Sequence, residues 1–322
     1  EVAEILRLAE VSEGELERVL ADVRAWYNGY RFSEESPHQL YNPDMVLYFA
    51  VNYREQRKYP KSLVDTNIAS DYGKINRMLR VGDEAINTAV LEEVIEEGSV
   101  VSGITEQFSF ERDWTRQDFV SMLFYLGMLT VREAIFDQWA LQIPNHVIGE
   151  LYYKFFQQML LRRGDLQRLD LRIPERMIAL ARDGDIEPLR EAFQMVLSHL
   201  DNRDARQLDE KHLKTALIAL MSPTGVYMVR SEQALGQGYP DILLLRRPPI
   251  LEPKRQYVFE LKYLKKSDAS RLSEVVEEGR AQLRRYLSHP EVVAQGDFVA
   301  YLWVVVGYEI ERVEEVRLVG QA

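Results

Sequence analysis

The chain has 322 residues, of which 46% are hydrophobic and 28% charged, an ordinary globular composition with enough length for two or three domains. It contains no cysteine, which excludes disulfides and thiolate metal sites. No apolar run reaches the ~18 residues that a membrane-spanning helix needs, and the first residues lack a basic signal-peptide start, so we expect a cytoplasmic protein without membrane contact.

The net charge of −11 argues against a surface that binds nucleic acid everywhere, because phosphate contacts come from lysine and arginine. The charge is distributed unevenly. Residues 246–286 contain eleven basic and six acidic residues, a net charge of +5, which leaves −16 for the rest of the chain. This basic segment suits a polyanionic substrate, and a solvated, arginine-rich helix face is the alternative interpretation.

The N-terminal part has helical patterning. Residues 1–30 show apolar positions at helical spacing, with Ser12 as the expected N-cap of a second helix. Asn28-Gly29 predicts a turn, and Asn42-Pro43 opens a further helix with proline in its first turn. Helices continue through residues 60–106.

A helix over 118–126 is followed by two strands, over 128–131 and 139–143. This order is typical of a winged-helix-like element. Because few basic residues accompany it, we expect a packing or partner-binding role rather than DNA contact. The Pro144-Asn145 break predicts a domain boundary, so the first domain is expected to span 1–144.

Residues 145–206 are expected to form a helical linker. The first helix, over 145–161, carries aromatic side chains at a spacing that favours core packing, and two more helices follow over 174–183 and 186–200. The second of these precedes a polar stretch that predicts a loop, 201–206.

The last part, 207–322, has the pattern of an α/β domain. We expect a helix over 210–221, strands over 226–230, 241–245 and 257–262, a helix over 272–287, a strand over 298–306 and an edge strand over 313–319. The order up to 306 is α-β-β-β-α-β, so the whole chain is expected to be a multi-domain α plus α/β protein.

The second and third of these strands form an expected hairpin with charge at one end. Asp241 lies at the start of its first strand, and Glu260 and Lys262 lie two apart on the second and therefore share a face. Charges among otherwise apolar side chains need partners or a metal, and a divalent cation would satisfy both carboxylates at once.

Pro240-Asp241 followed by Glu260-Leu261-Lys262 resembles the motif of the PD-(D/E)XK nuclease superfamily. Gln282 and Tyr286 resemble the Gln-X-X-X-Tyr signature of its recombination and phage exonuclease branch. Those relatives usually place arginine between glycine and aspartate, whereas this chain has Gly238-Tyr239-Pro240 before Asp241, which puts an arginine role in doubt.

The resemblance implies a restriction-endonuclease-like core that uses Mg²⁺ or Mn²⁺. Asp241 and Glu260 are the expected metal ligands, with Glu232 completing the set directly or through water. Lys262 is expected to orient the attacking water and offset phosphate charge. Gln282 and Tyr286, one helical turn apart, are expected to order the site.

A second resemblance lies near the N-terminus. Trp26-Tyr-Asn-Gly-Tyr-Arg-Phe32 and Tyr41-Asn-Pro43 resemble signatures near the end of a predicted AAA-ATPase-like domain that precedes a PD-(D/E)XK nuclease in one bacterial family. In that signature, aspartate is commoner than asparagine at the position of Asn28. The sequence contains no G-x-x-x-x-G-K-[ST] phosphate loop, so we expect 1–144 to be the remnant of such a domain and ATP not to bind.

Taken together, these patterns predict a Mg²⁺-dependent nuclease that hydrolyses nucleic-acid phosphodiesters, with DNA as the favoured substrate. Lys265, Arg280 and Arg284 are the expected phosphate contacts. The alternative is a non-catalytic module that uses the nuclease fold to bind nucleic acid or a partner. The five histidines are scattered, and no G-x-S-x-G elbow occurs, which argues against a zinc enzyme or a serine hydrolase.

Overall fold

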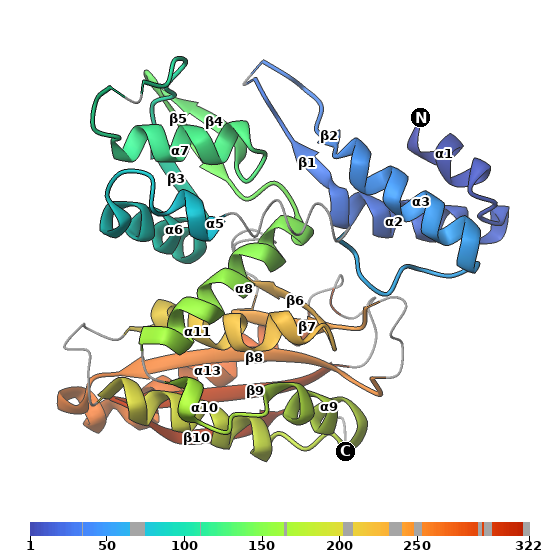
Figure 1. Ribbon diagram of the computed structural model, residues 1–322. Coiled ribbons are helices and arrows are strands. Elements are labelled where there is room, and N and C mark those ends of the chain that lie inside the picture. Colours follow the sequence, from blue (N-terminus) through green and yellow to red (C-terminus); the bar gives the residue numbers. More distant parts are fainter. Residues whose placement is uncertain are drawn as a thin grey trace. The chain divides into compact units, whose positions relative to one another are not determined.

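The computed structural model describes residues 1–33, 35–64, 75–109, 111–163, 166–201, 209–231, 240–247, 253–288, 292 and 298–317. The chain forms two compact units, Glu1–Phe155 and Phe156–Ala322 (Figure 1). The division falls inside helix α8 (His146–Arg163), whereas the boundaries expected from the sequence, 144/145 and 206/207, stay predictions. No helix in the described ranges combines the length and the apolar character that crossing a membrane requires.

The first unit begins with helices packed around an aromatic cluster. Its first elements are α1 (Val2–Leu8), α2 (Glu13–Tyr27), the paired strands β1 (Asn28–Tyr30) and β2 (Leu40–Tyr41), and α3 (Pro43–Gln56). Trp26 and Phe49 are almost fully buried and pack against Tyr59, with ring centroids 5.6 and 5.4 Å away. Asn42 caps α3 by accepting a hydrogen bond from the backbone N–H of Met45, as its sequence position predicted.

The rest of this unit combines helices with a three-stranded antiparallel sheet. Its elements are α5 (Ile75–Met78), α6 (Glu84–Glu97), β3 (Ser99–Ser102), α7 (Arg116–Tyr125), β4 (Thr130–Ile135) and β5 (Gln138–Gln142), with strand order β3-β5-β4. The expected helix followed by two strands is present as α7, β4 and β5. Its assignment as a winged-helix-like element stays a prediction.

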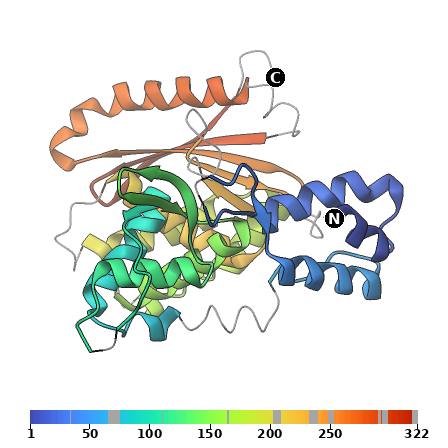
Figure 2. The same cartoon turned by 90° about the horizontal axis from the view of Figure 1, so that it is seen from above.

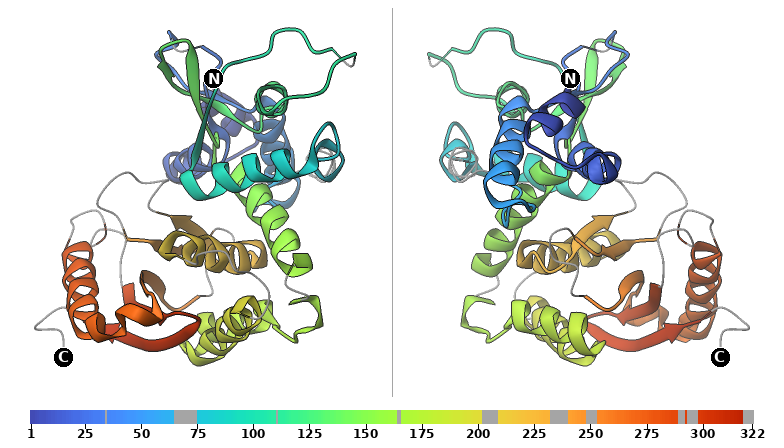
Figure 3. Two further views of the ribbon diagram at one scale, coloured as in Figure 1. Left: turned by 90° about the vertical axis from the view of Figure 1, so that its left-hand side faces the viewer. Right: turned by 90° about the vertical axis from the view of Figure 1, so that its right-hand side faces the viewer.

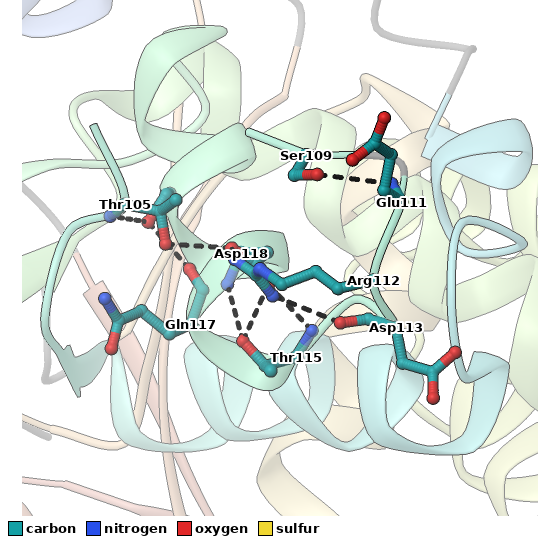
Figure 4. A network of polar contacts seen from close by, with 9 residues as sticks. Thr105, Ser109, Glu111, Arg112, Asp113, Thr115, Gln117 and Asp118 are labelled. Atoms are coloured by element: carbon teal, nitrogen blue, oxygen red, sulfur yellow. Dashed lines mark hydrogen bonds and ion pairs between the residues drawn. The ribbon is translucent and has the colours of Figure 1, made fainter. Parts of the chain in front are cut away.

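A buried carboxylate fixes the start of α7 (Figure 4). Asp118 is 1% exposed, and its two oxygens accept hydrogen bonds at 2.7 Å from the Arg112 guanidinium. Thr115 and Asp118 form a reciprocal capping box, and the Thr105 hydroxyl donates to Asp118 at 2.9 Å. The hydrogen bonds from Arg112 in particular lower the pKa of Asp118, so the network ties the preceding loop to the helix at neutral pH.

The second unit is built on a five-stranded sheet. Its helices are α9 (Ile173–Asp183), α10 (Glu187–Asp201), α11 (Glu210–Met221) and α13 (Leu272–Leu287), with short 3₁₀ turns at Leu166–Arg168, Ser222–Thr224 and Lys266–Arg271. Its strands are β6 (Met228–Ser231), β7 (Ile242–Leu245), β8 (Gln256–Leu264), β9 (Phe298–Val306) and β10 (Glu309–Val316), in the order β10-β9-β8-β7-β6. β8 and β9 are parallel and every other pair is antiparallel.

The helices cover the two faces of this sheet. α13, which connects β8 to β9, packs Val275, Val276 and Leu283 against one face (Figure 2). The helices α9 and α10 lie on the other face (Figure 3). There, Phe193 of α10 packs against Trp303 of β9, and the hydroxyl of Tyr257 donates to the Leu180 carbonyl of α9. The α-β-β-β-α-β order with a mixed sheet agrees with the expected core, and β10 is the expected edge strand.

Candidate active site

The register of β7 and β8 brings the two predicted carboxylates together. Ile242 pairs with Phe259 and Leu243 with Val258, so Asp241 stands opposite Glu260 where the hairpin opens. Glu260 and Lys262 share a face of β8 with Val258 and Leu264, which belong to the core covered by α13. All three charged residues are buried, with 6% of Asp241, 3% of Glu260 and 8% of Lys262 exposed.

Each charge in this buried group has a defined partner. Asp241 accepts a hydrogen bond from the backbone N–H of Leu261 at 2.8 Å and another from the Lys214 ammonium at 3.2 Å. The Lys262 ammonium lies 2.9 Å from Oε1 of Glu260. The other oxygen, Oε2 of Glu260, is buried and has no hydrogen-bond partner in the described part of the chain.

The sequence alone did not reveal two charged residues of α11. Glu210 places Oε1 3.8 Å from the Lys262 ammonium, and Lys214, one turn further along, pairs with Asp241. The side chain of Asp209 caps α11 by accepting from the backbone N–H of His212, which fixes where the helix begins. The sequence feature that could have identified them is the i, i+4 spacing of these two charged residues on a helix that buries Leu213 and residues 215–221.

Burial and neighbouring charges raise the pKa of Glu260 to about 8, with burial as the larger cause and the carboxylate of Asp241 as the second. Burial also raises the pKa of Glu210. Burial by itself would lower the pKa of Lys262, but the carboxylates of Glu260, Glu210 and Asp241 outweigh it and raise that pKa. These shifts keep the lysine charged and make Glu260 bind a proton more readily than an exposed glutamate does when no other cation is present.

The oxygen donors of the site suit a hard divalent cation. Mg²⁺ and Mn²⁺ prefer carboxylate oxygens and are commonly held by one or two of them, with water and substrate phosphate completing the shell. Asp241 and Glu260 supply that number, and the unpartnered Oε2 of Glu260 is an acceptor that such an ion would satisfy. The described residues contain no group of three or more His, Cys, Asp or Glu that could hold a metal. Glu232, the third predicted ligand, lies outside the described residues.

The predicted ordering residues lie on α13, the helix that covers the Glu260 face of the sheet. Oε1 of Gln282 is buried and accepts no hydrogen bond from any described residue, which makes its amide available to a bound group. Tyr286 is partly buried and packs against the core cluster of the sheet. The two residues thus differ in surroundings although they stand one turn apart.

The three predicted phosphate contacts also have different surroundings. Lys265 and Arg284 are exposed, Lys265 directly after β8 and Arg284 on α13. Arg280 instead donates to both oxygens of Glu314 on β10, at 2.7 and 2.6 Å, and pairs with Glu277. These hydrogen bonds raise its pKa and engage its guanidinium in joining α13 to the edge strand.

Comparison with curated proteins and with solved structures gave no match. None of the comparisons supports the expected relation of residues 1–144 to AAA-ATPase-like domains. Comparison with protein-family models matches one part of the chain, which begins just before α11 and ends inside β10. The chain thus carries, in residues 208–315, a segment that matches the PD-(D/E)XK nuclease superfamily, the part that contains the Asp241, Glu260 and Lys262 site.

Proposed function

We propose that the second unit is a metal-dependent nuclease that hydrolyses phosphodiesters of nucleic acid, with DNA as the favoured substrate. The observation that carries the proposal is the buried group of Asp241, Glu260 and Lys262 within the segment that matches the nuclease superfamily. Burying two carboxylates and an ammonium group costs folding free energy. Buried charged groups with shifted pKa values cluster at functional sites.

In this proposal Asp241 and Glu260 hold Mg²⁺ or Mn²⁺, which supplies Lewis-acid stabilisation of charge on the phosphate. Glu232 is proposed as a further ligand. Binding requires Glu260 to give up its proton, because only the carboxylate form is a ligand.

Lys262 is proposed to donate hydrogen bonds to the attacking water and to a non-bridging phosphate oxygen. Water adds to phosphorus and releases a proton to solvent, and the bond to the leaving oxygen breaks. The leaving oxygen takes up a proton, so the products are a phosphate monoester and a hydroxyl. Glu210 lies beside Lys262 and would keep the lysine charged while the phosphate enters. Gln282 and Tyr286 are proposed to order the site, and Lys265 and Arg284 to contact the nucleic-acid backbone.

The test is incubation of the purified chain with circular DNA, linear DNA and RNA in the presence of Mg²⁺, Mn²⁺ or chelator. We expect cleavage with either metal and none with chelator. Circular DNA separates cleavage within a strand from cleavage at ends. Binding of nucleic acid without cleavage under every condition would instead favour a non-catalytic module.

A second measurement tests the metal site without an activity readout. Metal that binds only the folded protein stabilises it by about 1.4 kcal/mol when its free concentration is ~10 times its dissociation constant. Thermal unfolding of the wild type should therefore shift upward with Mn²⁺, whereas Asp241→Asn should unfold at the same temperature with metal and with chelator. Asp268→Asn, in the same unit, is the control that should keep the wild-type shift.

A further inference from the structure

A polar cavity in the first unit is not used by the proposed nuclease reaction. It has a volume of 560 Å³ and lies between the end of α2, strand β1 and the loop before β2, lined by Arg24, Asn28, Arg31, Ser36, Pro37, His38 and Gln39. Pockets for small ligands commonly measure roughly 300–1,000 Å³. Asn28 and Arg31 belong to the Trp26–Phe32 motif, for which the nuclease site offers no role.

The backbone that forms one wall of this cavity is held in place. Gly29 has φ +133°, and a Cβ there would lie 1.8 Å from the carbonyl oxygen of Pro144, so only glycine fits. The backbone N–H of Arg31 donates to the Thr130 hydroxyl at 2.6 Å, and the Arg31 carbonyl accepts from Val131 at 3.1 Å. These contacts fix Asn28 and Arg31 before any ligand arrives, which reduces the ordering cost of binding.

The described residues of the lining carry positive charge. They include two arginines and one histidine, and none of those described is aspartate or glutamate. The exposed side chain of Arg24, in the last turn of α2, has no hydrogen-bond or ion-pair partner among the described residues. The Arg31 guanidinium donates to the Arg132 carbonyl at 3.1 Å, which orients it. Guanidinium groups recognise phosphate and carboxylate, and two of them suit a phosphate dianion better than a single carboxylate.

Asn28 adds an acceptor to this cationic lining. Its backbone N–H donates to the Arg24 carbonyl, but its side-chain Oδ1 is buried and accepts no hydrogen bond within the described chain. A buried acceptor without a donor costs about 1–3 kcal/mol. The dianionic phosphate group of a phosphate ester has no proton to donate to this oxygen, whereas a hydroxyl elsewhere on the ligand would satisfy it.

We propose that this cavity binds a phosphorylated sugar, with its phosphate on Arg24 and Arg31 and a sugar hydroxyl donating to Asn28. The Ser36 hydroxyl donates to the His38 carbonyl at 2.9 Å, which holds together two lining residues of the loop before β2. None of the described residues that line the cavity belongs to the proposed nuclease site.

Isothermal titration calorimetry with ribose 5-phosphate, inorganic phosphate and ribose tests the proposal. We expect saturable binding of ribose 5-phosphate, weaker binding of phosphate and none of ribose. Arg24→Gln should weaken binding of ribose 5-phosphate about tenfold or more, because it removes a charge-assisted contact. Arg54→Gln, an exposed arginine of α3 outside the cavity, is the matched control and should bind as the wild type does.

Asn28→Ala separates the two halves of the proposed ligand. This variant should bind ribose 5-phosphate no more tightly than phosphate, while its affinity for phosphate stays that of the wild type. Equal affinity of the wild type for the two compounds would refute the sugar contact. Absence of binding, or an Arg24→Gln variant that binds as the wild type does, would overturn the whole site. Lys262→Met should leave this binding unchanged, so the result does not depend on the nuclease proposal.

Discussion

Glu260 and Lys262 share one face of β8, where Oε1 of Glu260 lies 2.9 Å from the Lys262 ammonium. Both side chains are buried, and their surroundings determine the effect of a single substitution. In a metal-free site the proton affinity of each residue depends on the charge of the other. Replacing one of these two side chains therefore changes the proton affinity of the other, in addition to its effect on phosphodiester cleavage.

Lys262→Met should lower the rate of phosphodiester cleavage by about 100-fold to 1,000-fold or more, because it removes a charge that acts on the transition state. Folding should survive, since Glu260 already has a raised pKa and can stay protonated without its partner. Single-turnover cleavage and thermal unfolding check both statements. Lys254→Met, an exposed lysine of the same unit, should cleave normally. Wild-type turnover in Lys262→Met would rule out the assigned role.

Glu260→Gln should change how stability depends on pH. In the folded protein the pKa of Glu260 is raised from its ordinary value of 4.5 to about 8. The folded state therefore binds a proton at Glu260 more tightly than the unfolded chain does. The stability that this proton contributes is fully present below pH 4.5 and is lost as the pH rises through 8. The loss is at most about 1.4 kcal/mol per pH unit within this window. In chelator, wild-type stability should therefore decline between pH 5 and 8 relative to that of Glu260→Gln. Denaturant unfolding at several pH values tests this, and parallel curves for the two proteins would contradict it.

At the scale of elements, the approach of α13 to the sheet depends on one glycine. A Cβ at Gly279 would lie 2.4 Å from Cδ1 of Leu302, a fully buried side chain of β9. Close packing of this kind lets α13 cover the Glu260 face, so helix and site are linked through the same core.

Gly279→Ala should destabilise the second unit by about 1–3 kcal/mol, since a methyl group must be accommodated in a filled core. Gly14→Ala in α2 is the matched control, because nothing lies within 4 Å of its added Cβ. That change should stabilise the first unit by roughly 0.5–1 kcal/mol through higher helix propensity. Chemical denaturation followed separately for each unit measures both. An unchanged midpoint for Gly279→Ala would mean that Leu302 can move away at little cost.

At the scale of the whole molecule, a chain of net charge −11 must bind a polyanion through a local surface. The segment 246–286 provides a net charge of +5, but the three basic residues predicted to contact phosphates are not equivalent. Arg280 is engaged with Glu314 and Glu277, while Lys265 and Arg284 are exposed.

Lys265→Ala combined with Arg284→Ala should reduce the salt dependence of duplex binding by about 1.8 log units per log unit of salt, at about 0.9 for each phosphate contact. Arg280→Ala should leave this slope unchanged, because its guanidinium already neutralises acids of the protein. Equilibrium binding to DNA at several salt concentrations measures the slopes. If Arg280→Ala alone makes the slope shallower, its ion pairs open on binding and the three residues act together.

Local periodicity and backbone chemistry were enough to predict the features that depend on neighbours in the chain. Strand periodicity placed Glu260 and Lys262 on one face, and the breaks around them predicted the hairpin that brings Asp241 beside them. The helix starts after Ser12 and Asn42 were predicted from the residue types that helix N-termini prefer. Asn42 makes the capping hydrogen bond, whereas the Ser12 hydroxyl donates to the Glu15 carboxylate and caps no backbone N–H. These are interactions between neighbours in the chain, so they can be recognised before the fold is known.

Contacts between residues far apart in the chain became known only from the folded structure. Lys214 pairs with Asp241, Glu210 lies beside Lys262, and Arg280 joins Glu314. The cavity beside Asn28 depends on the approach of Gly29 to Pro144. No local pattern encodes these contacts, because each depends on how whole helices and strands pack, and packing is set by the combined burial of many side chains.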